Sequence, residues 1–167
     1  MDDPVLRRRS IRKYTAEPVL DEHVERLLRA AMAAPSAGNQ QPWQFIVIRE
    51  RALLEAIPGV HPYATMAPQA RLAILVCGDR HLERWPQYWE QDCAAATENL
   101  LIAATQLGLG AVWLGVHPLE ERVDGVRALF GIPRHVTPFA LVPVGWPAED
   151  KAPSDRYEEE RVHHDRW

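Results

Sequence analysis

Apolar and polar positions follow a helical period in three parts of the chain. Residues 20–34 place apolar side chains on one face of a helix, and Pro35 ends the pattern. Residues 90–107 form a longer alanine- and leucine-rich stretch, which is followed by Gly108, a residue suited to a left-handed helix cap. A third helix is predicted over residues 119–130, with Gly131 at its end.

Short apolar runs between turn-forming residues predict four strands, at residues 43–48, 72–77, 111–114 and 138–145. Prolines in the last run restrict where it can form hydrogen bonds. The order of helices and strands is mixed and has no regular βαβ repeat. The pattern therefore favours an α+β sandwich over a doubly wound sheet, with residues 1–167 forming a single domain.

Composition narrows the class of protein. The chain has 167 residues, 47% hydrophobic and 25% charged, with a formal net charge of -4. These values are typical of a soluble globular protein, and the negative charge argues against a nucleic-acid partner. The apolar stretches are too short to cross a bilayer, and the start of the chain resembles no targeting segment. We expect a cytoplasmic protein with no membrane association.

The two cysteines, Cys77 and Cys93, lie in apolar runs and have no CxxC or companion histidine spacing. We expect two buried free thiols, with neither a disulfide nor a metal site. The histidines are not assigned to catalysis.

Residues 149–167 differ from the rest of the chain because charged residues surround Tyr157, Val162 and Trp167. Such a tail cannot form a core of its own. A solvated terminus is one interpretation. The spaced aromatic residues favour another, an arm that packs on a partner subunit.

Four arginines lie within the first twelve residues, at positions 7, 8, 9 and 12, and Ser10 lies among them. Alone, this run is typical of a solvated helix turn. Arg8, Ser10 and Arg12 alternate, however, so they can converge on one anionic ligand, and the arginine fork suits phosphate.

Two further segments have the character of binding loops. Residues 34–43 form a turn-rich loop with three side-chain amides, which suit the alternating donors and acceptors of a flavin pyrimidine ring. Residues 107–115 contain closely spaced glycines, but they follow a helix and precede a strand, the reverse of a dinucleotide fingerprint. We expect these glycines to let the backbone approach a flat ligand.

The order of these segments resembles the nitroreductase superfamily of FMN enzymes, over nearly the whole chain. The matching motifs are Arg8-Arg9-Ser10-Ile11-Arg12-Lys13-Tyr14, Ala34-Pro35-Ser36 through Gln41-Pro42-Trp43, Asp92-Cys93-Ala94, Gly108-Leu109-Gly110-Ala111-Val112-Trp113, Pro143-Val144-Gly145-Trp146-Pro147 and Arg156-Tyr157. The resemblance implies an α-β-α sandwich with a central mixed, mainly antiparallel sheet. It also implies a homodimer that exchanges C-terminal arms and holds FMN at the interface.

The resemblance also implies a set of FMN-binding residues: Arg8, Arg9, Ser10, Arg12, Pro35, Ser36, Ala37, Asn39, Gln41, Trp113, Leu114, Gly115 and Arg156. In this set Arg12 faces the N1/O2 edge of the flavin and Arg8 the phosphate. The loop that begins at Pro35 reaches the flavin from the other subunit, and residues 113–115 pass the flavin N5. Trp85, Tyr88 and Trp89 are candidates for a substrate lid.

The implied activity is hydride transfer from NADH or NADPH through FMN to a nitroaromatic, a quinone or a similar acceptor, by a ping-pong mechanism. Two alternatives remain open. One is a flavin-binding regulatory dimer without efficient turnover. The other is a specialised reaction of the same fold, flavin cleavage or reductive dehalogenation. The polar residue that some members place against the pyrimidine has no match within residues 61–69.

Overall fold

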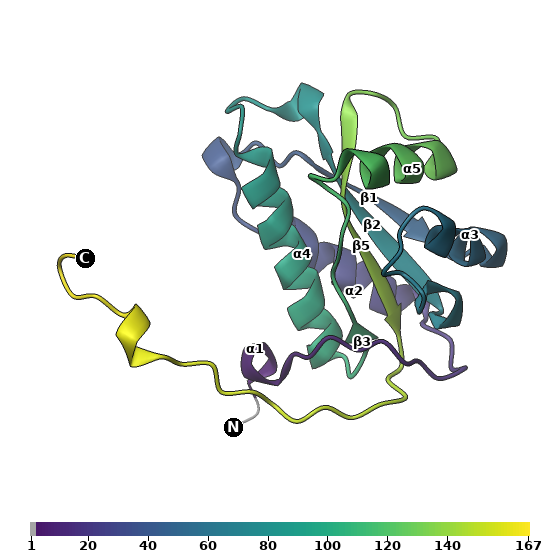
Figure 1. The fold of residues 1–167 in the computed structure, drawn as a ribbon, viewed down its shortest axis with the longest axis horizontal. Helices are drawn as coiled ribbons and strands as arrows, with labels where there is room; N and C mark the ends of the chain where they lie inside the picture. Colours follow the sequence, from purple (N-terminus) through teal and green to yellow (C-terminus); the bar gives the residue numbers. More distant parts are fainter. Residues whose placement is uncertain (1–2) are drawn as a thin grey trace.

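The structure is a computed structural model that describes residues 3–167 (Figure 1). Its α-helices are α1 (Pro4–Arg7), α2 (Asp21–Met32), α3 (Arg51–Ala56), α4 (Trp89–Gln106) and α5 (Glu120–Phe130). Its strands are β1 (Trp43–Ile48), β2 (Leu72–Asp79), β3 (Gly110–Ala111), β4 (Leu114–Gly115) and β5 (Val136–Gly145). The 3-10 turns η1 (Ala37–Asn39), η2 (Ile57–Gly59), η3 (Ala67–Gln69) and η4 (Arg80–Leu82) lie between these elements, and η5 (Glu159–Arg161) follows the last strand.

The strands form one sheet in the order β1-β2-β5-β3, with β4 also paired to β5. All pairs between these strands are antiparallel. An isolated parallel bridge joins Ser10 to Ala111 at the β3 edge. The predicted α+β class and the mixed, mainly antiparallel central sheet are confirmed.

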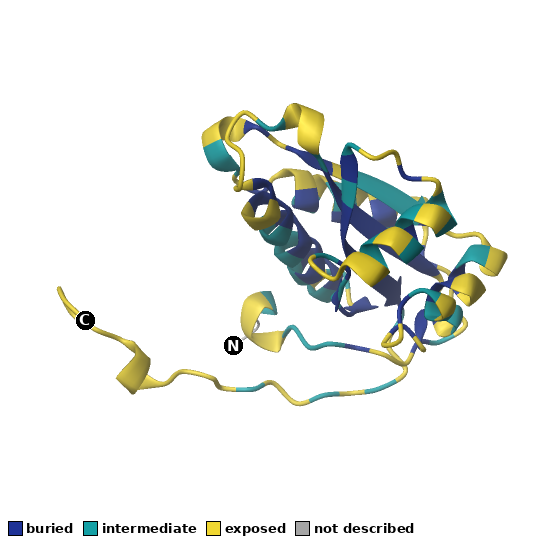
Figure 2. Cartoon of the chain, turned by 45° about the horizontal axis from the view of Figure 1, so that its top comes forward, coloured by how far each residue is buried: buried dark blue, intermediate teal, exposed yellow. Residues whose placement is uncertain are grey.

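Strand β2 lies at the centre of the sheet and separates two hydrophobic clusters. Ile74 and Val76 belong to the cluster that includes α2 and α4, whereas Leu75 and Cys77 belong to the cluster that includes α3 and α5. Alternate residues of a strand point to opposite faces, so β2 is buried on both sides (Figure 2). The result is the predicted α-β-α arrangement of layers.

The prediction of one strand over residues 111–114 was wrong in detail, because two short strands replace it. Ala111 pairs with Val144 and Leu114 with Leu141, so β3 and β4 keep the same register along β5. That register brings Val112 opposite Pro143, which has no backbone N–H to donate. The proline therefore interrupts the ladder between the two pieces.

The predicted helices agree with α2, α4 and α5 to within two residues at their ends. Gly108 and Gly131 have φ values of 75° and 64°, in the left-handed region expected of a glycine that ends a helix. Helices α1 and α3 were not predicted, because four and six residues are too few to show a helical period.

Both cysteines are free and buried, as predicted. Burial raises the pKa of Cys77 to about 12. The Cys93 thiol donates to the backbone carbonyl of Cys77 at 3.6 Å and lies between β2 and α4, whereas the Cys77 side chain belongs to the cluster on the α3 and α5 face. These thiols therefore serve as small core residues.

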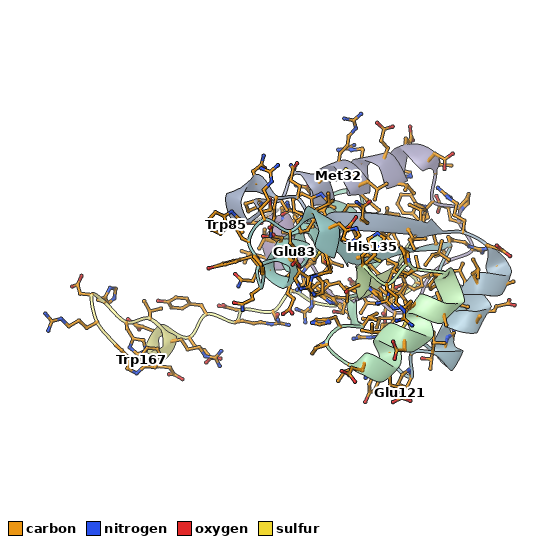
Figure 3. The ribbon with its side chains drawn as sticks, turned by 90° about the horizontal axis from the view of Figure 1, so that it is seen from above. Met32, Glu83, Trp85, Glu121, His135 and Trp167 are labelled. Carbon is orange, nitrogen blue, oxygen red and sulfur yellow. The ribbon has the colours of Figure 1, made fainter. Side chains whose placement is uncertain are left out.

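Residues 149–167 leave the body of the protein as an extended arm (Figure 1). Tyr157, Val162 and Trp167 are exposed, and Trp167 is fully exposed at the tip (Figure 3). Across residues 3–167, no helix is long and apolar enough to span a membrane.

Candidate functional site

An extended N-terminal segment carries the arginine run along the edge of the sheet. Ser10 bridges to Ala111, and the N–H of Ile11 donates to the carbonyl of Ala111 at 3.0 Å. Further along, Tyr14 bridges to Pro147. Its hydroxyl donates to the carbonyl of Ile11 at 2.7 Å, and burial raises its pKa.

Two glycines make room for this segment. A Cβ atom on Gly110 would lie 2.6 Å from Ile11 Cγ2, and one on Gly145 would lie 3.0 Å from Tyr14 Cδ1. Ile11 and Tyr14 are buried against the strand ends, whereas Arg12 between them is exposed. The two apolar anchors thus hold the backbone while Arg12 faces outward.

Arg12 lies at the edge of a cavity of about 590 Å³, which we call the Arg12 pocket. It is lined by Arg12, His61, Pro62, Tyr63, Thr65, Met66, Trp113, Leu114, Gly115 and Arg122. The structure therefore brings together four residues of the predicted set, Arg12 and residues 113–115. Its volume falls in the range of small-molecule sites, roughly 300–1,000 Å³.

His61 and Arg122 hold the strand residue Gly115 at the back of this pocket. His61 Nε2 and Arg122 Nη1 each lie 2.9 Å from the Gly115 carbonyl oxygen. Because a carbonyl only accepts, His61 carries its proton on Nε2 and offers Nδ1 as an acceptor. Nδ1 is buried without a hydrogen-bond partner in residues 3–167, and burial lowers the pKa of His61.

A second cavity, of about 240 Å³, gathers other arginines of the predicted set. It is lined by Val5, Leu6, Arg8, Arg9, Ser154, Asp155, Arg156 and Tyr157, and we call it the arginine pocket. Arg9 Nη1 donates to Ser154 Oγ at 2.6 Å, while its buried Nε atom has no partner within the described residues. Arg8 Nε lies 3.1 Å from Glu98 Oε1. An anion here would meet several guanidinium groups.

Ser10 lines neither of the two pockets. Its carbonyl accepts from Lys151 Nζ at 2.6 Å. Nearby, the N–H of Arg12 donates to Glu149 Oε1 at 2.6 Å, and this hydrogen bond is the main cause that lowers the pKa of Glu149. These contacts fix the root of the C-terminal arm beside the arginine run.

The loop over residues 35–41 lies elsewhere, near the start of α4. None of the predicted residues Pro35, Ser36, Ala37, Asn39 and Gln41 lines either pocket within a single chain. Asn39 and Gln41 have φ values of 55° and 48°, which are uncommon for residues other than glycine. Strain of this kind is kept only where surrounding contacts define the backbone.

Those contacts come from a buried pair, Asp92 and Gln40. Asp92 Oδ1 accepts from the N–H of Ala37 at 2.9 Å, and Asp92 Oδ2 accepts from Gln40 Nε2 at 2.6 Å. Gln40 Oε1 in turn accepts from the N–H groups of Arg84 and Trp85 at 2.9 and 3.0 Å. We call these residues the Asp92–Gln40 network, which ties two loops to α4.

The three candidate lid residues do not share one environment. Trp85 and Tyr88 are exposed, and Trp85 stands at the edge of the molecule (Figure 3). Trp89, by contrast, is 2% exposed and packs so closely on Gly78 that a Cβ there would lie 2.2 Å from its ring. Assigning Trp89 to a lid was therefore wrong, because it belongs to the core.

Sequence reasoning missed the pocket residues His61, Tyr63, Thr65, Met66 and Arg122. Arg122 lies in a helix whose pattern looked merely amphipathic, and residues 61–66 form turns without a regular period. The histidine-proline pair at 61–62, between a helix and a strand, was the available signal. Tertiary contacts alone bring these residues beside Gly115.

Comparisons with known proteins agree with this geometry. A family model described as the Nitroreductase family matches residues 5–76 and 60–146. The chain is 52% identical over 160 residues to a protein of Methanothermobacter thermautotrophicus with the provisional name NADH dehydrogenase/NAD(P)H nitroreductase, covering 96% of this chain and 84% of that one. It is 34% identical to the oxygen-insensitive NADPH nitroreductase of Salmonella typhimurium, over 94% of this chain and 70% of the other.

A solved structure extends the agreement to the fold. The crystal structure of a provisionally named nitroreductase from Desulfovibrio desulfuricans, in complex with FMN, superposes with a TM-score of 0.85 at 33% identity. The match covers 98% of this chain and 95% of that one. The sheet, the helical layers and the extent of these matches lead to one conclusion: the chain belongs to the nitroreductase family.

Proposed function

We propose that the chain is an FMN-dependent oxidoreductase that transfers hydride from NADH or NADPH to a nitroaromatic, a quinone or a similar electron-poor acceptor. The observation that carries this proposal is the Arg12 pocket, where a guanidinium group lies beside the backbone of residues 113–115. The names of the relatives, NAD(P)H nitroreductases and an FMN complex, support the same activity.

The residues present fit FMN at both ends of that molecule. Trp113, Leu114 and Met66 offer apolar surface for a flat ring system, and Arg12 offers charge at the rim. The arginine pocket supplies guanidinium groups for a phosphate, including the Arg9 Nε atom, which has no partner among residues 3–167. Four residues of extended chain, roughly 13 Å, separate Arg8 from Arg12, so one elongated ligand can meet both.

When bound, FMN would supply the hydride chemistry of its ring system, and the protein supplies position and electrostatics. Arg12 would hold positive charge beside the N1/O2 edge, where reduction places negative charge. His61 and Arg122 keep the Gly115 backbone in place through its carbonyl. We propose that the nucleotide donor and the acceptor occupy this pocket in turn, which is a ping-pong mechanism.

We further propose that residues 1–167 act as one domain within a homodimer. The exposed aromatic side chains of the arm, residues 149–167, are suited to packing on a partner subunit. The loop at residues 35–41 lies away from the pockets of its own chain. In the dimer, that loop would complete the flavin site of the neighbouring subunit.

The test is to purify the protein, load it with FMN and add NADH or NADPH without oxygen. Bleaching of the yellow flavin, followed by reoxidation when a quinone or nitroaromatic is added, is the expected result. A flavin that binds but is reduced by neither nucleotide would favour the regulatory dimer instead. A protein that cannot be loaded with FMN would overturn the proposal.

A further inference from the structure

Three metal-ligating side chains meet at the end of the sheet, outside both pockets. They are Asp79 at the end of β2, His81 in η4 and His135 just before β5. Their candidate ligand atoms all lie within 4.8 Å of one another. The sequence showed no metal signal here, because 54 positions separate the two histidines.

Backbone hydrogen bonds hold Asp79, His135 and the residue before His81 in place. The N–H of Asp79 donates to the carbonyl of Pro42 at 2.7 Å, and the N–H of Arg80 donates to the carbonyl of His135 at 2.8 Å. Sheet register pairs Asp79 with Val136, the neighbour of His135. Asp79 therefore starts from the end of β2, His135 from the residue before β5, and His81 from η4.

The side chains are also free to coordinate. The rings of His81 and His135 stack in parallel, 4.1 Å apart at an interplanar angle of 2°, and within residues 3–167 their nitrogens make no hydrogen bond. Asp79 Oδ1 accepts from the N–H of His81 at 2.9 Å, which leaves Oδ2 available. The nearby cation of Arg80 is paired with Glu83.

The charge and donor set point to one class of ion. In the described chain Asp79 has no ion pair, so its carboxylate faces two imidazoles without a compensating cation. Two imidazoles and one carboxylate suit Zn²⁺ and similar transition-metal ions, whereas Mg²⁺ and Ca²⁺ prefer all-oxygen ligands. Ligands of a tetrahedral Zn²⁺ lie roughly 3.4 Å apart. Each imidazole coordinates through a lone pair in its own ring plane, so one of the two stacked rings must rotate out of the stack for both to reach the same ion.

We propose that Asp79, His81 and His135 form a binding site for a divalent transition-metal ion of the Zn²⁺ class. The bound ion links the end of β2 and η4 to the residue before β5. It thereby fixes the start of the segment over residues 80–88, which carries the exposed Trp85 and Tyr88. The site lies outside both pockets, so it does not depend on the proposed oxidoreductase function.

The test is a calorimetric titration of the full-length protein with Zn²⁺. It is done in the variant His163→Ala/His164→Ala, because the adjacent histidines of the arm form a competing ligand pair. We expect one ion per chain, retained in a large excess of Mg²⁺. Adding His81→Ala or His135→Ala should weaken binding by at least about tenfold, the scale reported for changes around metal ligands.

Two further measurements show whether the metal binds at this site. His23→Ala, whose ring packs on Trp146, is the matched control and should leave binding unchanged. Co²⁺ in place of Zn²⁺ should give visible absorption bands that are lost in His81→Ala, while circular dichroism shows that the variant remains folded. Binding that persists in both His81→Ala and His135→Ala, or no binding in the parent protein, would overturn the proposal.

Discussion

The Asp92–Gln40 network offers a sharp test of how the loop at residues 35–41 is held. The substitution Asp92→Asn keeps one oxygen but replaces the other with an NH₂ group. If the amide oxygen continues to accept from Ala37, its NH₂ group faces the NH₂ group of Gln40. Turning the Gln40 amide around does not help, because its NH₂ group would then face the N–H groups of Arg84 and Trp85.

The cost follows from these contacts. One buried hydrogen bond to a charged group is lost, worth about 1.5–3 kcal/mol, and a buried donor is left without an acceptor. Asp92 is 4% exposed, so its charge is kept at a cost in desolvation energy. The neutral asparagine avoids that cost, which offsets part of the loss in unfolding free energy. We expect a net loss of about 2 kcal/mol in unfolding free energy, or roughly thirtyfold in the unfolding equilibrium.

Urea unfolding followed by circular dichroism measures this difference. The matched control is Glu90→Gln, a carboxylate-to-amide change in the first turn of the same helix, which removes the same charge from the helix N-terminus. Glu90 is half-exposed and, within residues 3–167, pairs only with His117 at 3.0 Å, so its change should cost less than about 0.5 kcal/mol. Equal unfolding free energies for the two variants would refute the role assigned to the network.

A double-mutant cycle locates the energy within the pair. Gln40→Ala and Asp92→Ala should each destabilise the protein, and the double variant should lose less than the sum of the two. Additive losses would show that the two side chains act independently. The affinity for FMN, measured by flavin fluorescence, is expected to fall in parallel if the loop contributes to the flavin site.

Three further predictions concern the pocket and the core. Arg12→Ala should slow flavin reduction by about 100-fold in stopped-flow absorbance, the scale of losing one charge-stabilising donor, and Arg12→Lys should lose less; equal rates would exclude the electrostatic role. Burial lowers the pKa of His61 in the folded protein from its ordinary 6.5, so the unfolded chain binds that proton more readily and stability falls as the pH drops below about 6.5. His61→Gln, which keeps a donor for Gly115, should reduce this pH dependence in urea unfolding at pH 5 and 7.5, and an unchanged dependence would assign it to other groups. Finally, Cys77 and Cys93 should not react with a thiol reagent in the folded protein at pH 8, and both should react in urea; rapid labelling of the native protein would show that they are accessible.

Local patterns predicted most of the fold because each depends on residues close in sequence. The period of residues 20–34 and 90–107 predicted α2 and α4, and the two glycines that follow α4 and α5 adopt the left-handed conformation expected of them. The short apolar runs predicted β1, β2 and β5. The break between β3 and β4 could not be predicted, since it depends on Pro143 lying opposite Val112 in the sheet.

The candidate site, like the fold, was predicted from the sequence only in part. The arginine run and residues 113–115 were predicted as binding segments from their residue types, and Arg12 does share a pocket with them. Trp89 was assigned to a lid because an aromatic residue near a loop looks the same in sequence whether it is exposed or buried. Its place in the core depends on Gly78, which leaves room for its ring.

What the amino-acid sequence by itself determined is the family, the three longer helices, the central strands and the segments that we propose bind an anionic, flat ligand. These follow from side-chain chemistry and from periodicities that span a few residues. Only the tertiary structure decided that His61 and Arg122 meet at Gly115, that Asp92 holds Gln40, and that Asp79 lies beside His81 and His135. The physical reason is that a hydrogen bond or a metal site depends on distances of a few ångströms, which packing sets between residues far apart in the chain.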